Sequence, residues 1–194
     1  MGGYLRNGRL QTNPGILGGG MCSASTTLFN AALRAGLRIT ERHAHALYIS
    51  RYPVGLDATV FSNGRSDGQN VKFVNDTGHP ILIRGYSGKR KVTFEIYGVD
   101  DGRRVRLSEP VVDNLVQAPM YLEYTDDLAP GVRHREQDAY DRFTSSVRRT
   151  VKGANGNVIW NDTFRSSYRM LAGIILVGRR PGDPPAGTRI LIDR

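Results

Sequence analysis

The sequence has little cysteine and no long apolar run, and each shortage narrows what the chain can be. Its 194 residues contain one cysteine, which excludes an internal disulfide framework and any metal site built from several thiolates. No stretch reaches the roughly 20 continuous apolar residues of a membrane-spanning helix. The N-terminal residues also lack an apolar run resembling that of a signal peptide. We therefore expect a soluble chain that folds around its own apolar core.

Acidic side chains are scarce in the first half of the chain. Residues 1–97 contain 12 basic and 5 acidic side chains, whereas residues 98–194 contain 15 and 13, and the whole chain carries a formal charge of +9. A basic half attracts polyanions in general, including nucleic acid, an anionic wall polymer or a membrane surface. Aromatic residues do not cluster with arginine in a stacking platform, so nucleic acid is not the expected partner.

Helical patterning is also scarce, and it predicts a single helix at about residues 22–35. Small and apolar residues such as Leu28 and Ala32 recur at helical spacing in this segment. Gly36 follows at the position of a left-handed C-terminal cap, and Leu37 can supply the hydrophobic contact that accompanies such a cap.

The rest of the chain shows the alternation of β-strands. In "KVTFEIY" (91–97) the apolar side chains share one face. Similar runs occur at 46–50, 57–62, 70–75, 80–84, 103–107, 111–117, 143–151, 157–165 and 170–177. Turn-forming pairs such as Asn155-Gly156 separate them. The predicted fold class is α+β, mainly antiparallel β-hairpins with one principal helix packed on the sheet.

A segment rich in proline, glycine and charge suggests how the chain is divided. We expect a core at 1–118, a charged linker at 119–140 ("PMYLEYTDDLAPGVRHREQDAY"), a β-hairpin extension at 141–178 and a Pro/Gly-rich tail at 179–194. The hairpin is too small to be stable alone, so it should pack on the core.

The cysteine lies in "GGGMCSASTTLFNAAL", directly after three glycines and at the predicted helix start. Free N–H groups and the helix dipole favour a thiolate at this position, which would make Cys22 nucleophilic. Gly18, Gly19 and Gly20 would let a substrate carbonyl approach the backbone, and their N–H groups could form an oxyanion hole. A buried, inert cysteine after a glycine turn is the alternative.

A base and an orienting acid can be found downstream. His43 and His45 in "ERHAHALYISRYP" would share one face of an extended segment, so either could serve Cys22 as a base. Asp57 in "PVGLDATV" could fix the histidine tautomer, or it could cap a turn or form a structural ion pair. The two histidines could also bind zinc, but the sequence offers no third ligand cluster, so we expect no metal and no cofactor.

Arg51 and Tyr52 come soon after His45. The Arg51 guanidinium could bind a substrate carboxylate through two hydrogen bonds, or it could pair with Asp57 within the fold. The glycine loop lacks the Lys-Ser/Thr ending of a phosphate-binding loop, so nucleotide binding is not expected.

These residues resemble a known family. "NGRL", "GGGMCSASTTLFNAALRAGL", "ERHAHALYISRYPVGLDATV" and "VKFVNDTGHPILI" are similar to the VanW domain, and "EIYG", "RTVKGANGNVIWNDTFRSSYR" and "IILVG" are similar to the tail that follows it. The resemblance covers residues 7–178. Ser23 stands where the family commonly has glutamine, and some family members have serine in place of the cysteine.

The resemblance implies a protein of Gram-positive bacteria that is extracellular or cell-wall associated, with an N-terminal anchor in the natural protein in many cases. Some members are reported as cysteine-dependent L,D-transpeptidases that cross-link peptidoglycan stem peptides. By position, Cys22 matches the proposed nucleophile, His45 the histidine and Asp57 the acid. The expected substrate-binding residues are Gly18, Gly19, Gly20, Ser23, Ser25, Thr26, Arg51 and Tyr52.

Two functions therefore remain open at this point. The first is a cysteine acyl transferase acting on peptidoglycan stem peptides through a Cys22 thioester, with a peptidase as the outcome if water is the acceptor. The second is a non-catalytic module that binds peptidoglycan or an anionic wall polymer through the basic first half.

Overall fold

The computed structural model describes residues 3–6, 9–12, 20–62 and 68–193. It has one helix, α1 (Met21–Arg34), and the strands are β1 (Gly3–Arg6), β2 (Arg9–Thr12), β3 (Arg38–Glu41), β4 (Lys72–Val74), β5 (Leu82–Gly88), β6 (Lys91–Tyr97), β7 (Arg104–Leu107), β8 (Val111–Val116), β9 (Met120–Thr125), β10 (Arg133–Gln137), β11 (Arg142–Lys152), β12 (Val158–Tyr168), β13 (Gly173–Gly178) and β14 (Arg189–Ile192). Within the described part of the chain, the fold is therefore β-rich with a single helix, as predicted.

Helix α1 begins and ends at glycines with left-handed backbone conformations. Gly20 precedes it with a φ of 102°, and Gly36 follows it with a φ of 76°. At its C-terminal end, the N–H of Leu37 donates to the Ala32 carbonyl and the N–H of Gly36 donates to the Leu33 carbonyl. This is the predicted glycine cap, and Leu37 is buried beneath it.

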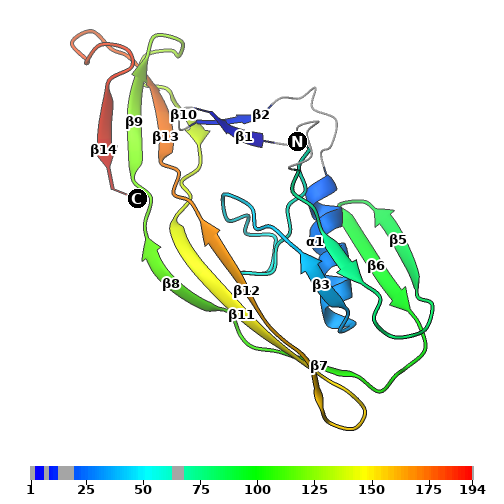
Figure 1. Cartoon of the computed structure of the whole chain (residues 1–194). Helices are drawn as coiled ribbons and strands as arrows, with labels where there is room; N and C mark the ends of the chain where they lie inside the picture. Colours follow the sequence, from blue (N-terminus) through cyan, green and yellow to red (C-terminus); the bar gives the residue numbers. More distant parts are fainter. Residues whose placement is uncertain (1–2, 7–8, 13–19, 63–67, 194) are drawn as a thin grey trace.

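Most strands pair antiparallel, in small separate sheets. β12, β11 and β7 form one sheet in which β8 also pairs with β11, and the pairs β1–β2, β3–β4 and β5–β6 are two-stranded. The fifth sheet, in the order β10-β13-β9-β14, contains one parallel pair, β13 with β9. In Figure 1 this group lies at one end of the molecule, and α1 lies at the other end beside β3 and the β5–β6 hairpin.

The β11–β12 hairpin joins the second half of the chain to the helix. In Figure 1 its two long strands extend from the β10-β13-β9-β14 sheet past α1. Arg149 of β11 is completely buried, and its Nη1 donates to the Leu33 and Leu37 carbonyls at the end of α1 at 3.1 and 2.9 Å. Asp162 of β12 balances this buried charge. These contacts pack the β11–β12 hairpin against the end of α1.

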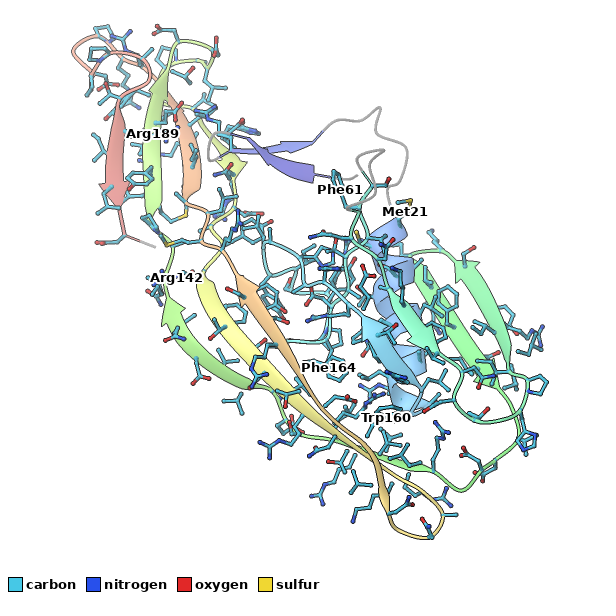
Figure 2. The ribbon with its side chains drawn as sticks, viewed as in Figure 1. Met21, Phe61, Arg142, Trp160, Phe164 and Arg189 are labelled. Atoms are coloured by element: carbon cyan, nitrogen blue, oxygen red, sulfur yellow. The ribbon has the colours of Figure 1, made fainter. Side chains whose placement is uncertain are left out.

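A small apolar core lies between the helix and the hairpin. Phe29 and Leu33 of α1 pack with Leu56, Ala58 and Val147, all of them buried. The Phe29 ring also meets Phe164 of β12 edge-on, with 5.7 Å between the ring centroids. In Figure 2 Phe164 lies between the hairpin and the region of α1. This packing fixes the helix and the segment around Ala58 relative to each other.

Two predicted strands are wrong, and both lie close to the predicted site. Residues 46–50 form a loop, and residues 57–62 contain only isolated bridges, including one between His43 and Thr59. Hydrogen bonds from α1, and not a neighbouring strand, hold the segment 57–62 in place. The side chains of Ser25, Thr26 and Asn30 donate to the carbonyls of Ala58 and Leu56.

The segment 119–140, expected as a charged linker, contains β9 and β10, and residues 189–192 of the tail form β14 against β9. The division into domains stays a prediction. No helix among the described residues has the length and apolarity needed to cross a membrane.

Candidate active site

Cys22 lies in the first turn of α1, facing the segment that follows Asp57. Its Sγ lies 3.5 Å from the Thr59 Oγ1 and 3.8 Å from the Val60 carbonyl oxygen. The carbonyl can accept a hydrogen bond from the thiol, and the hydroxyl can donate one to the thiolate, so both protonation states have a partner. The helix start also carries no side-chain cap and no acidic residue in its first turn. The positive end of the helix therefore remains available to a negative charge.

His45 and Asp57 form a close pair beside this cysteine. The His45 Nδ1–H donates to Asp57 Oδ2 at 2.6 Å, and the His45 backbone N–H donates to the same oxygen at 2.7 Å. The pair is largely buried, with the histidine side chain 11% exposed and the aspartate side chain 2% exposed. These two bonds fix the imidazole tautomer, so that Nε2 is the nitrogen available to exchange a proton.

The electrostatics of the three residues favour a charged resting state. The hydrogen bond to His45 lowers the pKa of the Cys22 thiol from 9.0 to about 7, against the opposing effect of burial. Burial by itself would lower the pKa of His45, but its hydrogen bonds with Asp57 and Cys22 outweigh this effect and raise that pKa to about 9. Between pH 7 and 9 the favoured state is a thiolate beside an imidazolium.

The His45 Nε2 is buried, and its hydrogen bond with Cys22 is longer or less well aligned than a normal hydrogen bond. The imidazole is nevertheless close enough to dominate the pKa of the Cys22 thiol. Catalytic hydrogen bonds are often long or poorly aligned in the absence of substrate. Cys22, His45 and Asp57 thus lie in the order that covalent catalysis by a cysteine would require.

Tyr52 lies against the histidine and is itself buried. Its ring stacks on the His45 ring with 5.3 Å between the centroids and 26° between the planes. Its hydroxyl lies 3.1 Å from the Ser23 Oγ, next in sequence to Cys22. Tyr52 and Ser23 were expected to contact substrate. In this structure they contact each other, and Tyr52 restricts the imidazole.

Ser25 and Thr26 were also expected to bind substrate, but they are buried. The Ser25 hydroxyl donates to the Ala58 carbonyl at 2.6 Å, while the Thr26 hydroxyl accepts from the Ala58 N–H and donates to its carbonyl. Both hydroxyls are therefore used to hold α1 against the segment that carries Asp57. A substrate-binding role for them is a prediction that their burial speaks against.

The remaining predicted residues lie at the edge of this group. His43 is 42% exposed and pairs with Glu41 at 3.1 Å, so the structure brings His45 and not His43 to Cys22. Arg51 is exposed over the Tyr52 ring and does not pair with Asp57. Gly18 and Gly19 lie outside the described residues. Among the residues that the structure describes, no group of three or more candidate ligands could hold a metal ion.

Two exposed apolar side chains lie near Cys22 (Figure 2). Met21 and Phe61 are 53% and 58% exposed. They adjoin Cys22 and Val60, which are themselves in contact. Figure 2 shows both side chains near the N-terminal end of α1. Two surface cavities of about 500 and 470 Å³ lie elsewhere, and neither is lined by Cys22, His45 or Asp57.

Sequence reasoning missed two residues that hold Asp57. The Arg42 Nη2 lies 2.9 Å from Asp57 Oδ1 in a buried ion pair, and the Tyr168 hydroxyl donates to the same oxygen at 2.7 Å. The position of Arg42 directly before His43 in the sequence could have indicated this ion pair, because a buried carboxylate needs a partner. Tyr168 lies 111 residues from Asp57, and nothing in its local sequence indicates the contact.

Comparison with known proteins agrees with the family resemblance. The sequence model of the family described as "VanW like protein" matches residues 2–97. The uncharacterized protein YoaR of Bacillus subtilis (strain 168) is 43% identical over 80 residues, which are 40% of this chain and 25% of YoaR. The matched segment thus spans about a quarter of the length of that relative.

Two solved structures show a faint likeness. The G5 domain of IgA1 protease is 12% identical at a TM-score of 0.26, over 40% of this chain and 93% of the domain. The structure named HP0197-G5 is 16% identical at a TM-score of 0.21, over 39% of this chain and 97% of that chain. TM-scores this low do not assign a fold. The sequence matches are the stronger finding, and they show that residues 2–97 of this chain are similar to the VanW family.

Proposed function

We propose that this chain is a cell-wall-associated domain in which Cys22 carries out acyl transfer on peptidoglycan stem peptides. The match to the VanW family supports the association with the cell wall. The observation that supports the chemistry is the pairing of His45 with Asp57 beside Cys22, which lowers the pKa of the thiol to about 7. A thiolate at neutral pH is the nucleophile that such a transfer requires.

The first half-reaction forms a thioester. The Cys22 thiolate attacks the carbonyl carbon of a stem-peptide amide, and the carbonyl electrons move to oxygen. The backbone N–H groups of Met21 and Cys22, which have no partner among the described residues, can donate to this oxyanion. The imidazolium of His45 then gives its Nε2 proton to the amine as the C–N bond breaks.

The second half-reaction releases the acyl group. An acceptor amine attacks the thioester carbonyl while the neutral His45 takes a proton from it at Nε2. Collapse of the tetrahedral intermediate breaks the C–S bond and restores the thiolate. Asp57 keeps the Nδ1–H oriented throughout both steps. Water as the acceptor would give hydrolysis at the same site.

A second candidate function is binding to peptidoglycan or an anionic wall polymer without catalysis. The family match supports wall association and carries no information on a reaction, so a binding module accounts for it equally well. Ser23 stands where the family commonly has glutamine, and its hydroxyl lies within hydrogen-bond distance of the Tyr52 hydroxyl. The 12 basic against 5 acidic side chains of residues 1–97 favour an anionic ligand.

Incubation with defined tetrapeptide muropeptides separates the two functions. Acyl transfer predicts cross-linked or trimmed products with the native chain and none with Cys22→Ala, together with a thioester adduct in the mass spectrum of the trapped protein. Binding alone predicts equal retention of both proteins on purified cell walls and no product from either. That second pattern would refute the catalytic proposal.

A further inference from the structure

The carboxylate of Asp57 is fully occupied by four hydrogen bonds from three residues. Oδ2 accepts from the backbone N–H and from the Nδ1–H of His45. Oδ1 accepts from Arg42 and from Tyr168, at 2.9 and 2.7 Å. Its two oxygens therefore have separate tasks, since one binds the histidine and the other is held by the surrounding fold.

Tyr168 belongs to the second half of the chain and contacts Asp57 of the candidate site. It is the last residue of β12, lies outside residues 2–97 and is completely buried. Its hydroxyl accepts the Gly55 N–H at 3.1 Å and therefore has its own proton directed at Asp57. The rings of Tyr48 and Phe143 contact the Tyr168 ring, with 5.4 and 4.7 Å between centroids. This packing leaves the hydroxyl little freedom.

The Arg42 guanidinium is also hydrogen-bonded to β12. Its Nη1 donates to the Arg165 carbonyl at 3.1 Å and to the Ser166 Oγ at 2.9 Å. On its other side, Nη2 donates to Asp57 and to the Gly55 carbonyl. With a side chain only 5% exposed, Arg42 connects β12 to the aspartate through a rigid, planar group.

We propose that β12 is part of the functional site, with Tyr168 and Arg42 as positioning residues that hold Asp57 so that its Oδ2 orients His45 toward Cys22. The functional unit then extends from α1 to β12, well beyond residues 2–97. The inference rests on the proposed function only for its effect on product formation. Its effect on the reactivity of the thiol stands independently of any substrate.

The central test is Tyr168→Phe, which keeps the buried ring and removes one hydroxyl. Tyr97→Phe is the matched control, because the Tyr97 hydroxyl also donates to a carboxylate, that of Glu95 at 2.7 Å, on an exposed strand. The measurements are the pH dependence of Cys22 alkylation by iodoacetamide and the proton NMR signal of the His45 Nδ1–H. Thermal unfolding checks that each variant is folded.

Tyr168→Phe should slow alkylation at pH 7 by about twofold to sixfold, the upper figure being the loss expected if the thiol pKa returned fully from about 7 to about 9. It should also shift or broaden the Nδ1–H signal, while Tyr97→Phe changes neither. A folded Tyr168→Phe with the native profile and signal would overturn the proposal. Should this variant fail to fold, Ser166→Ala removes one bond to Arg42 and a longer one to the Gly55 carbonyl, and it should move the profile in the same direction by a smaller factor. A native profile for a folded Ser166→Ala would then overturn the proposal.

Product formation distinguishes this inference from the proposed function. If the native chain yields no cross-linked or trimmed muropeptide but Tyr168→Phe still shifts the alkylation profile, acyl transfer fails and the positioning role stands. If the native chain is active and Tyr168→Phe retains both native activity and the native profile, the positioning role fails instead.

Discussion

The most informative prediction concerns the thiol of Cys22 when His45 is replaced. The hydrogen bond to His45 is the largest cause of the fall in thiol pKa from 9.0 to about 7. His45→Gln keeps a donor for Asp57 and a similar volume but removes the positive charge. The pKa of Cys22 should then return to about 9 or above, because burial still disfavours the thiolate.

The size of the effect on rate follows from these two pKa values. At pH 6 a change of about two units reduces the thiolate fraction about a hundredfold. A thiolate of higher pKa is intrinsically more reactive, which recovers a factor of about eight when the Brønsted coefficient is about 0.45. Reaction with a disulfide probe at pH 6 should therefore slow by roughly tenfold in His45→Gln.

The assay is the second-order rate of reaction with 4,4′-dithiodipyridine, measured from pH 5 to 10. His43→Gln is the matched control, since His43 is exposed and pairs with Glu41. The native chain should show an apparent pKa of about 7, and the control should reproduce it. A native midpoint near 9, or a midpoint near 7 that persists in folded His45→Gln, would refute the reasoning.

Three further predictions concern activity and stability. Formation of muropeptide products should follow a bell-shaped pH profile, because it needs the Cys22 thiolate and the His45 imidazolium, with limits at about 7 and about 9; a rate that rises steadily to pH 10 would contradict this role of His45. Phe29→Ala should lower the free energy of unfolding by about 3–5 kcal/mol in urea titration, because Phe29 is completely buried. Gly20→Ala should cost about 1–2 kcal/mol in the same experiment, entirely from backbone strain, because φ is 102° and an added Cβ meets no atom within 4 Å.

Local patterning predicted the regular elements well. The helix lies at Met21–Arg34, against an expected 22–35, and the hairpin around Asn155-Gly156 is present as β11 and β12. These elements depend on residues adjacent in sequence, such as a glycine cap or a tight turn. The same patterning failed for residues 46–50 and 57–62, because neither segment has a neighbouring strand along its length. Residues 57–62 are held instead by hydrogen bonds with Ser25 and Thr26 of α1.

The three central residues of the candidate site could be selected from the sequence because each carries its own local signal. Cys22 follows glycines at a helix start, His45 lies in a histidine pair, and Asp57 lies in a motif of the family. Their mutual distances could not be predicted. They depend on the packing of α1 against the segment around Ala58, where the contacts join residues more than 30 positions apart.

The sequence by itself therefore determined the β-rich class of fold, the single helix, the candidate nucleophile and the resemblance to a family. Only the tertiary structure placed His45, rather than His43, beside Cys22, placed Tyr52 against the imidazole and revealed that Arg42 and Tyr168 hold the aspartate. The physical reason is that a buried carboxylate must be satisfied by whichever donors the fold brings to it. For Asp57 one of those donors comes from a strand 111 residues away.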